Sequence, residues 1–310
     1  MIGATATTLL IAVGVDGLLG ELPNRWHPVA WMGTAIGAVR TWCSDRNPAV
    51  SFLSGSLLVA VGVAASIAAG LLIEQMAPPL LHGAVLSTMI GVRSLATAAI
   101  AVRDPLAAGD LQTAREQLAY HLVSRDTTEL DTSDVSAAAI ESVAENSSDS
   151  VVAPLLFYVV GGLPAAISYR FVNTCDAMVG YRTPSLEWFG KPAARLDDLL
   201  NLLPARLTVL FLAAASGSIR GFAVWRTDAA ETPSPNGGHP MSMAAGILGV
   251  RLAKPGVYVL GKSLRRPGVD DLSKMLSLYR RTVLVAVVVL TGFAVAAPIV
   301  FGPALYREAG

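Results

Sequence analysis

Six apolar runs, each close to 20 residues long, constrain this chain more than any other feature. A run of that length crosses the hydrocarbon core of a bilayer, about 30 Å thick, as one α-helix. A single run can be a buried helix of a soluble protein, but six in a chain with 53% hydrophobic and 15% charged residues argue against that. The runs cover residues 2–19, 52–73, 84–102, 151–171, 207–224 and 283–301. The sequence therefore predicts an all-α, polytopic bundle of five or six spans, integral to a membrane.

One predicted span carries its own interruption. Residues 151–171 contain Gly161, Gly162 and Pro164, which weaken or break a helix, so a broken or re-entrant span is one of the arrangements that the sequence leaves open there. No internal repeat or low-complexity linker is visible, which predicts one catalytic domain over residues 1–310.

Polar segments connect the runs, and the segment 103–150 has a helical pattern. Leu111, Leu118 and Leu122 recur at helical spacing, and residues 131–134 offer N-caps for a second helix to about Asn146. We therefore expect short helices outside the membrane in addition to the spans.

The distribution of Lys and Arg predicts the orientation. Segment 226–281 is rich in both, so the positive-inside rule puts it on the cytoplasmic side of the cell membrane, together with segments 21–51 and 103–150. Segment 173–206 lies on the opposite side if 151–171 crosses fully, or at membrane depth if the site folds inward. Both arrangements stay open.

Charge and cysteine content exclude other classes of protein. The 23 basic and 23 acidic side chains balance, which offers nucleic acid no overall attraction. Cys43 and Cys175 lack metal-site spacing and do not form a disulfide framework. The first run has no basic leader and contains Asp16, so we do not expect a cleavable signal peptide.

A first polar cluster precedes the interrupted span. Glu141 and Glu145 are one helical turn apart, and Asn146 and Asp149 follow directly. Carboxylate oxygens are the ligands that Mg²⁺ prefers, commonly together with phosphate. An ordinary solvated helix face is the alternative, but this cluster leads straight into apolar sequence, so we favour a site.

A second cluster follows the same span. It contains acids that can hold a metal and arginines that can clamp phosphate or carboxylate oxygens. Some of these charges, such as Arg195 with Asp198, can instead be interfacial salt bridges. The cluster consists of Asn173, Thr174, Asp176, Tyr181, Arg182, Lys191, Arg195, Asp197, Asp198, Asn201 and Arg206.

Two weaker signals and one coincidence remain. SPNGGHP at 234–240, before an expected helix from Met241 to Leu252, is either an anion-binding helix start or a plain turn. His27, beside Pro28, is either a base or a local hydrogen-bonding group. Residues 256–263 fit the P-loop expression, but Pro255 and large apolar residues inside it argue against a phosphate loop.

Several long motifs, in order from Asp16 to about Leu252, resemble the adenosylcobinamide-phosphate synthase family of cobalamin biosynthesis, the CobD/CbiB family. The motifs are DGLLGELPNRWHPVAWMG at 16–33, SRDT at 124–127, ESVAENSSDSVVAPLLFY at 141–158, NTCDAMVGYRTPSLEWFG at 173–190, ARLDDLLNLLPARLT at 194–208 and SPNGGHP at 234–240. The chain departs from the family pattern at Ser124, at residues 241–243 and at Ala253-Lys254. The role of the SPNGGHP turn is therefore carried over less securely.

The resemblance implies a multi-pass membrane enzyme, a ligase that joins adenosylcobyric acid to (R)-1-amino-2-propanol or its O-phosphate. ATP and Mg²⁺ are the expected co-reactants, and the corrinoid is a substrate, not a cofactor. The implied partners are these small molecules, the lipid bilayer and other membrane enzymes of cobalamin assembly, with no nucleic acid.

Amide formation needs an activated carboxylate, which predicts roles for the clustered residues. We expect catalytic roles for Asp176, Asp197, Asp198 and Glu145, with Asp176 as base or amine-binding anion. The predicted magnesium ligands are Glu141, Glu145 and Asp149, or Asp197 and Asp198. The predicted substrate- and phosphate-binding residues are Arg125, Asn146, Asn173, Tyr181, Arg182, Lys191, Arg195, Asn201, Arg206, Asn236 and His27.

Two other functions compete with this one. A magnesium-dependent membrane prenyltransferase also uses paired acidic motifs, but those at 173–176 and 197–201 are too close in sequence for opposite helices. A transporter also uses broken helices with inward charges, but it is expected to have two related halves, which are not visible.

Overall fold

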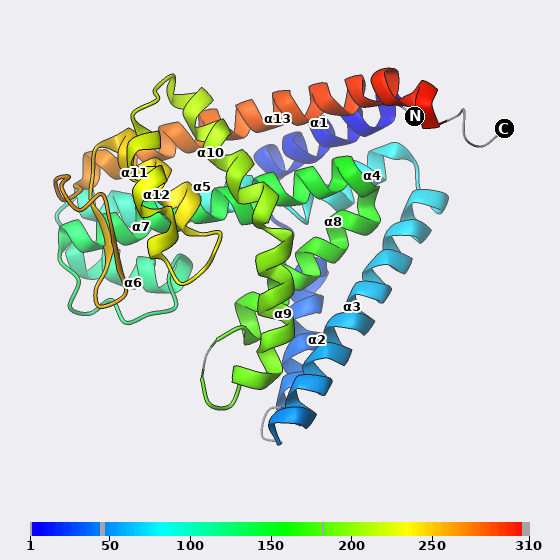
Figure 1. The fold of residues 1–310 in the computed structure, drawn as a ribbon, viewed down its shortest axis with the longest axis horizontal. Helices are drawn as coiled ribbons and strands as arrows, with labels where there is room; N and C mark the ends of the chain where they lie inside the picture. The colour runs from blue at the N-terminus through cyan, green and yellow to red at the C-terminus, as the bar shows by residue number, and fades with distance from the viewer. Residues whose placement is uncertain (1, 44–46, 182, 306–310) are drawn as a thin grey trace. The chain divides into compact units, whose positions relative to one another are not determined.

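The computed structural model describes residues 2–43, 47–181 and 183–305. These residues are mostly helical, which confirms the predicted all-α class (Figure 1). The α-helices are α1 (Ile2–Leu19), α2 (Pro28–Cys43), α3 (Pro48–Met76), α4 (Pro79–Ser87), α5 (Val92–Ala107), α6 (Leu111–His121), α7 (Thr132–Ser147), α8 (Ala153–Val179), α9 (Glu187–Leu200), α10 (Leu202–Ser216), α11 (Gly221–Asp228), α12 (Gly238–Leu248) and α13 (Val269–Leu305).

Shorter elements complete the described chain. Strands β1 (Leu252–Lys254) and β2 (Tyr258–Leu260) form an antiparallel hairpin, which the sequence did not predict. Single 3₁₀ turns cover Asn24–Trp26 and Ala229–Glu231, and one π-helical turn, Ser148–Val152, joins α7 to α8.

Among the described residues, four helical stretches are long and apolar enough to cross a membrane. They are Pro48–Met76, Pro79–Ala107, Thr132–Val179 and Val269–Ala296. The bent pair α9 and α10, which meet at 44°, makes a fifth if it counts as one span. These helices support a multi-pass membrane protein.

Two predicted boundaries were wrong. The apolar run 207–224 is not one helix, because α10 ends at Ser216 and Gly217 takes a left-handed conformation with φ 62°. The helix expected over Met241–Leu252 begins at Gly238 and ends at Leu248, where Gly249 (φ 66°) stops it. Glycine adopts positive φ without steric cost and commonly ends helices in this way. The two helices predicted within 103–150 are confirmed as α6 and α7.

The chain divides into two compact units. The first unit contains the described residues of 1–91, 153–200 and 287–310, and the second contains 92–152 and 201–286. The prediction of one catalytic domain over the whole chain stays a prediction.

In the first unit α2, α3, α8 and α9 run beside one another (Figure 1). Ile36, Phe171, Cys175 and Phe189 are among the buried residues of their shared core. Glycines let α3 approach closely: a Cβ at Gly55 would lie 2.0 Å from the Phe189 carbonyl oxygen. Small residues at helix contacts serve the same purpose in membrane proteins generally.

In the second unit α12 packs against α7, α10 and α11, and α5 packs against α6 and α7. Strand β1 also contacts α7. A small apolar core forms around Val152, Phe211 and Ala286. The elements that carry the first polar cluster therefore lie against the hairpin and against α12.

Helix α8 is broken where the sequence predicted an interruption. Gly161 and Gly162 have non-helical backbone angles, and Gly162 has φ 66° and ψ −160°. The freed backbone N–H of Leu163 donates to Oε1 of Glu74 on α3, at 2.8 Å. A buried backbone N–H without an acceptor costs about 1–3 kcal/mol, so Glu74 acts as the cap of the second half of α8.

We expect Glu74→Ala to lower the free energy of unfolding by about 1–3 kcal/mol, because the Leu163 N–H loses its acceptor. Thermal unfolding of the detergent-purified protein measures this. Glu74→Gln is the matched control, since its side-chain carbonyl oxygen can still accept the bond. Equal stability of Glu74→Ala and the unmodified protein would contradict the capping role.

Candidate functional site

A small polar cavity lies in the second unit. Its volume is about 180 Å³, and it is bordered by the segment that follows α6, by α7 and by the hairpin. The lining residues are Leu122, Val123, Ser124, Arg125, Ala138, Glu141, Ser142, Glu145, Asn146, Lys254 and Tyr258. Both carboxylate and cationic side chains therefore face the same cavity.

Helix α7 supplies the acids because of its capping and its spacing. Asp131 caps the helix by accepting from the backbone N–H groups of Ser133 and Asp134, both at 2.9 Å. Arg266 fixes the same cap with a 2.7 Å contact to the Asp131 carboxylate. From that start, the helical period places Glu141 and Glu145 on one face, and both line the cavity.

A hydrogen bond from Ser142 holds α7 against the segment that carries Arg125, and a second bond within α7 supports Ser142. The Ser142 hydroxyl donates to the backbone carbonyl of Leu122 at 3.0 Å. The side-chain amide of Asn146 donates back to the Ser142 carbonyl at 2.9 Å. This backbone contact positions Arg125 opposite the acidic face of α7.

Arg125 and Glu141 form a loose, buried ion pair. The distance from Arg125 Nη2 to Glu141 Oε2 is 3.6 Å, and Glu141 is 5% exposed. Within the described part of the chain, Arg125 Nε, Arg125 Nη1 and Glu141 Oε1 have no hydrogen-bond partner. Buried polar atoms are nearly always paired in proteins, so these three point to a polar ligand in the cavity.

The hairpin completes the cavity with Lys254 and Tyr258. Their Cα atoms are paired across the two strands, and Gly256, with φ 72°, makes the turn between them. Burial raises the pKa of the Tyr258 phenol, and the Glu141 and Glu145 carboxylates raise it further. Tyr258 therefore stays a neutral hydroxyl that can donate a hydrogen bond.

The hairpin also shows that residues 256–263 do not form a phosphate-binding P-loop. Residues 256–263 include β2 and its flanking turns, without the strand-loop-helix geometry that cradles phosphate. The backbone N–H of Gly261 instead donates to Asp228 at 2.6 Å. The interpretation of this match as a coincidence is confirmed.

The SPNGGHP turn lies against the same acidic face. A Cβ at Gly237 would lie 2.4 Å from Oε1 of Glu145, so only glycine fits there without a shift. Arg206 Nη1 donates to Asn236 Oδ1 at 2.9 Å and to the Leu202 carbonyl at 2.9 Å. Asn236 and Arg206 thus fix the turn instead of lining the cavity.

The next residue of the turn is also fixed by a neighbour. Trp225 Nε1 donates to His239 Nδ1 at 2.9 Å. Burial lowers the pKa of His239, and Arg206 lowers it further, which keeps the ring neutral and able to accept this bond.

Part of the second predicted cluster forms a chain of contacts in the first unit. Arg170 Nη1 donates to Asn173 Oδ1, and Asn173 Nδ2 donates to Asp197 Oδ1, both at 3.3 Å. Asp197 is 8% exposed. Asp176 interacts electrostatically with Asp198 and lies against the backbone of Gly180, where a Cβ would meet its Oδ1 at 2.0 Å.

Other residues of the second cluster that were predicted to bind substrate or phosphate lie outside this chain of contacts. Tyr181 and Arg195 are exposed. Lys191 pairs with Glu187 at 3.2 Å and lies 4.0 Å from the Trp188 ring centroid, an arrangement typical of a surface anchor. Arg182 lies outside the described residues.

Two further predicted residues are buried. Asn201 is 2% exposed, between α9 and α10. His27 is 8% exposed, and its Nδ1 accepts from the Val29 N–H at 3.2 Å, which is the local hydrogen-bonding alternative.

Sequence reasoning missed Lys254, Tyr258 and Arg170. Lys254 and Tyr258 stood in or beside the rejected P-loop match, so that stretch was set aside as a whole. Arg170 is a charge within an apolar run, and that signal alone could have found it.

No group of three His, Cys, Asp or Glu side chains that could hold a metal is found among residues 2–43, 47–181 and 183–305. Glu141, Glu145 and Asp149 are therefore not gathered as one ligand set, and Asp149 does not line the cavity. Two carboxylates, Glu141 and Glu145, do face it. That pair fits the way proteins bind Mg²⁺ through one or two carboxylates together with phosphate oxygens.

Comparisons with known proteins agree with one another. A family model described as "CobD/Cbib protein" matches residues 9–296. A "Probable cobalamin biosynthesis protein CobD" from Methanothermobacter thermautotrophicus is 43% identical over 264 residues, which are 82% of this chain and 86% of that protein.

Bacterial relatives have similar coverage. A "Cobalamin biosynthesis protein CobD" from Chromobacterium violaceum is 43% identical over 80% of this chain and 81% of its own length. One from Rhodobacter capsulatus is 38% identical over 89% of this chain and 93% of its own length. No solved structure gives a significant match.

The raised pKa of Tyr258 predicts a titration. Absorbance of the folded protein and of Tyr258→Phe should rise in parallel through about pH 10, because the buried phenol does not yet ionise. After unfolding in denaturant, the unmodified protein should show one more ionising tyrosine than the variant. The pKa of Tyr258 is higher in the folded state than in the unfolded state. Its contribution to stability is therefore complete below the unfolded-state pKa and is lost as the pH rises from there through the folded-state pKa. A difference between the folded proteins near pH 10 would contradict the burial of Tyr258.

Proposed function

We propose that this chain, which belongs to the CobD/CbiB family of cobalamin biosynthesis proteins, forms the amide bond between adenosylcobyric acid and (R)-1-amino-2-propanol or its O-phosphate. The observation that carries the proposal is one cavity in which family-motif residues of opposite charge face each other. Arg125, Glu141, Glu145 and Asn146 all lie in motifs that resemble this family and all line that cavity.

The reaction requires the carboxylate to be activated before the amine attacks. In the proposed sequence the carboxylate takes the terminal phosphoryl group of ATP, which gives an acyl phosphate and ADP. The neutral amine then attacks the acyl carbon, phosphate leaves with the electron pair of the broken C–O bond, and a base accepts the amine proton. Such chemistry needs cations beside the phosphate oxygens and an acid–base group beside the amine.

The cavity offers groups for these tasks. Arg125 has two unpartnered N–H-bearing nitrogens inside the described structure, and with Lys254 it can bind the oxygens of phosphate or carboxylate. The neutral Tyr258 hydroxyl can donate to the same oxygens. Glu141 and Glu145 would hold Mg²⁺ together with phosphate oxygens, and the ion would supply charge neutralisation there. With no ion bound, both acids attract an ammonium group.

The size of the cavity limits what enters it. A volume of about 180 Å³ fits a phosphoryl or carboxyl group with a small amine, and the corrin ring is far larger. We therefore propose that the cavity receives the reacting groups and leaves the corrin outside. Asp176, Asp197 and Asp198 of the first unit are retained as catalytic candidates from the sequence.

We expect Glu145→Gln to reduce amide formation about 100-fold or more, because it removes one of the two cavity carboxylates with little change of shape. The assay incubates purified protein with adenosylcobyric acid, each amine form, ATP and Mg²⁺, and measures the product by mass spectrometry. Glu129→Gln is the matched control, since Glu129 is exposed and does not line the cavity. Turnover of Glu145→Gln at the rate of Glu129→Gln would remove the cavity from the reaction.

Asp198→Asn tests the first unit in the same assay. We expect loss of product with normal yield and thermal stability, and unchanged turnover for Asp270→Asn, whose carboxylate is exposed. Full activity of Asp198→Asn would exclude a catalytic role for that carboxylate. Absence of amide product from the unmodified protein with both amines would overturn the proposed function itself.

A further inference from the structure

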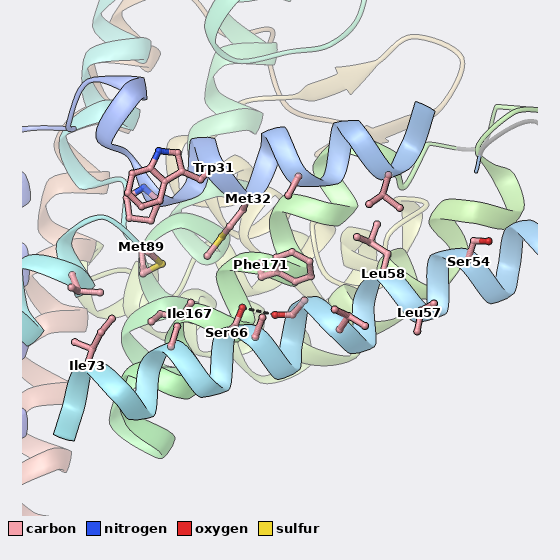
Figure 2. Close-up of a pocket in the computed structure, with 18 residues that line it drawn as sticks. Trp31, Met32, Ser54, Leu57, Leu58, Ser66, Ile73, Met89, Ile167 and Phe171 are labelled. Atoms are coloured by element: carbon pink, nitrogen blue, oxygen red, sulfur yellow. Dashed lines mark hydrogen bonds between the residues drawn. The ribbon is translucent and has the colours of Figure 1, made fainter. Parts of the chain in front are cut away.

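A long apolar groove lies in the first unit, between α2 and α3 and above α8 (Figure 2). Its volume is about 900 Å³. The lining residues are Pro28, Trp31, Met32, Ala35, Val39, Ser54, Leu57, Leu58, Val61, Gly62, Ala65, Ser66, Ala69, Ile73, Val85, Met89, Ile167 and Phe171. None of these side chains is charged, so the groove does not suit the polar substrates of the proposed function.

The few polar groups in the groove are not available to a ligand at its centre. The Ser66 hydroxyl donates to the Gly62 carbonyl at 2.8 Å, the dashed bond of Figure 2. Phe171 forms part of the floor, and its ring leaves no room for a Cβ at Gly62. The groove therefore recognises an occupant by apolar contact alone.

The helix that borders the groove indicates whether water or lipid reaches it. Helix α3 is a candidate membrane span, and only 17% of its most apolar window is buried. Leu57 and Val61, which line the groove, are 65% and 59% exposed. In a bilayer these surfaces meet hydrocarbon chains and not water.

The length of the groove suits an extended chain as the occupant. Ser54 and Ile73 lie near opposite ends of the groove, roughly 28 Å apart along the axis of α3. A flexible acyl chain is narrower than a helix, which is about 10 Å wide with its side chains, and can extend along the groove.

One end of the groove has the residues of a membrane interface. Trp31 lies at that end near Met89 and Ile73, and its indole N–H donates to the Arg25 carbonyl at 3.0 Å. Trp26 and Trp31 are 61% and 55% exposed, and Trp is enriched at headgroup depth. The Arg25 guanidinium, 6.0 Å from the Trp26 ring, is a cation that complements a lipid phosphate.

We propose that this groove binds the acyl chains of a membrane phospholipid, with Arg25 beside the headgroup phosphate. The bound lipid fills the space between α2 and α3 and so supports the packing of both helices on α8. This site is separate from the polar cavity of the second unit and does not depend on the proposed function.

The test fills the groove with a side chain. Ala64 and Ala65 are both exposed, but only Ala65 lines the groove, so Ala65→Phe and Ala64→Phe form a matched pair. Native mass spectrometry of the proteins released from mild detergent measures the fraction that retains phospholipid. We expect the fraction that retains phospholipid to be at least about tenfold smaller for Ala65→Phe than for Ala64→Phe, because the introduced phenyl ring would occupy the place of the acyl chain.

A second measurement separates chain from headgroup. Delipidated protein is titrated with dioleoyl phosphatidylglycerol and, separately, with glycerol 3-phosphate, which has the headgroup phosphate but no chains. Binding of the first and not of the second supports the proposal. Equal lipid retention by the two Phe variants, equal binding of glycerol 3-phosphate, or a lipid-free dimer that Ala65→Phe dissociates would overturn it.

Discussion

Polar groups that leave water in a chain this apolar require a partner, and the described structure is organised around supplying those partners. The freed N–H at the break of α8 finds Glu74 on a neighbouring helix. The buried Glu141 lies opposite Arg125, and Asp197 receives a hydrogen bond from Asn173. Each pairing connects two segments far apart in sequence, so satisfying a buried polar group also fixes how helices pack.

The same constraint marks the candidate site. At most positions the partners of buried polar atoms are supplied from within the described chain. Around the cavity of the second unit, atoms of Arg125 and Glu141 lack them among the described residues. The same fold gives the Leu163 N–H a partner in Glu74. The atoms of Arg125 and Glu141 that are unpaired within the described structure therefore mark the cavity as a place for a polar ligand. The apolar groove shows the converse, with its hydroxyl satisfied and hydrocarbon as the fitting occupant.

Sequence patterns predicted much of this because they report local physics. The length of the apolar runs predicted membrane-type helices, and the Gly161-Gly162 pair marked the place where α8 is broken, although the sequence left that break open. Residue types at 131–134 predicted an N-cap in that stretch, and the structure identifies Asp131 as the cap. The error over residues 207–224 arose because hydropathy continues past Ser216, whereas Gly217 ends the helix through its backbone conformation.

The sequence by itself determined the class of the protein, its family and the face of α7 that carries Glu141 and Glu145, since spans, motifs and helical spacing are properties of neighbouring residues. Only the tertiary structure decided that Lys254 and Tyr258 join that face and that Gly237 lies against Glu145. It also decided that Arg206 and Asn236 bond to each other. These contacts join residues that are far apart in the chain, and which of them form depends on how whole helices pack, which no local pattern encodes.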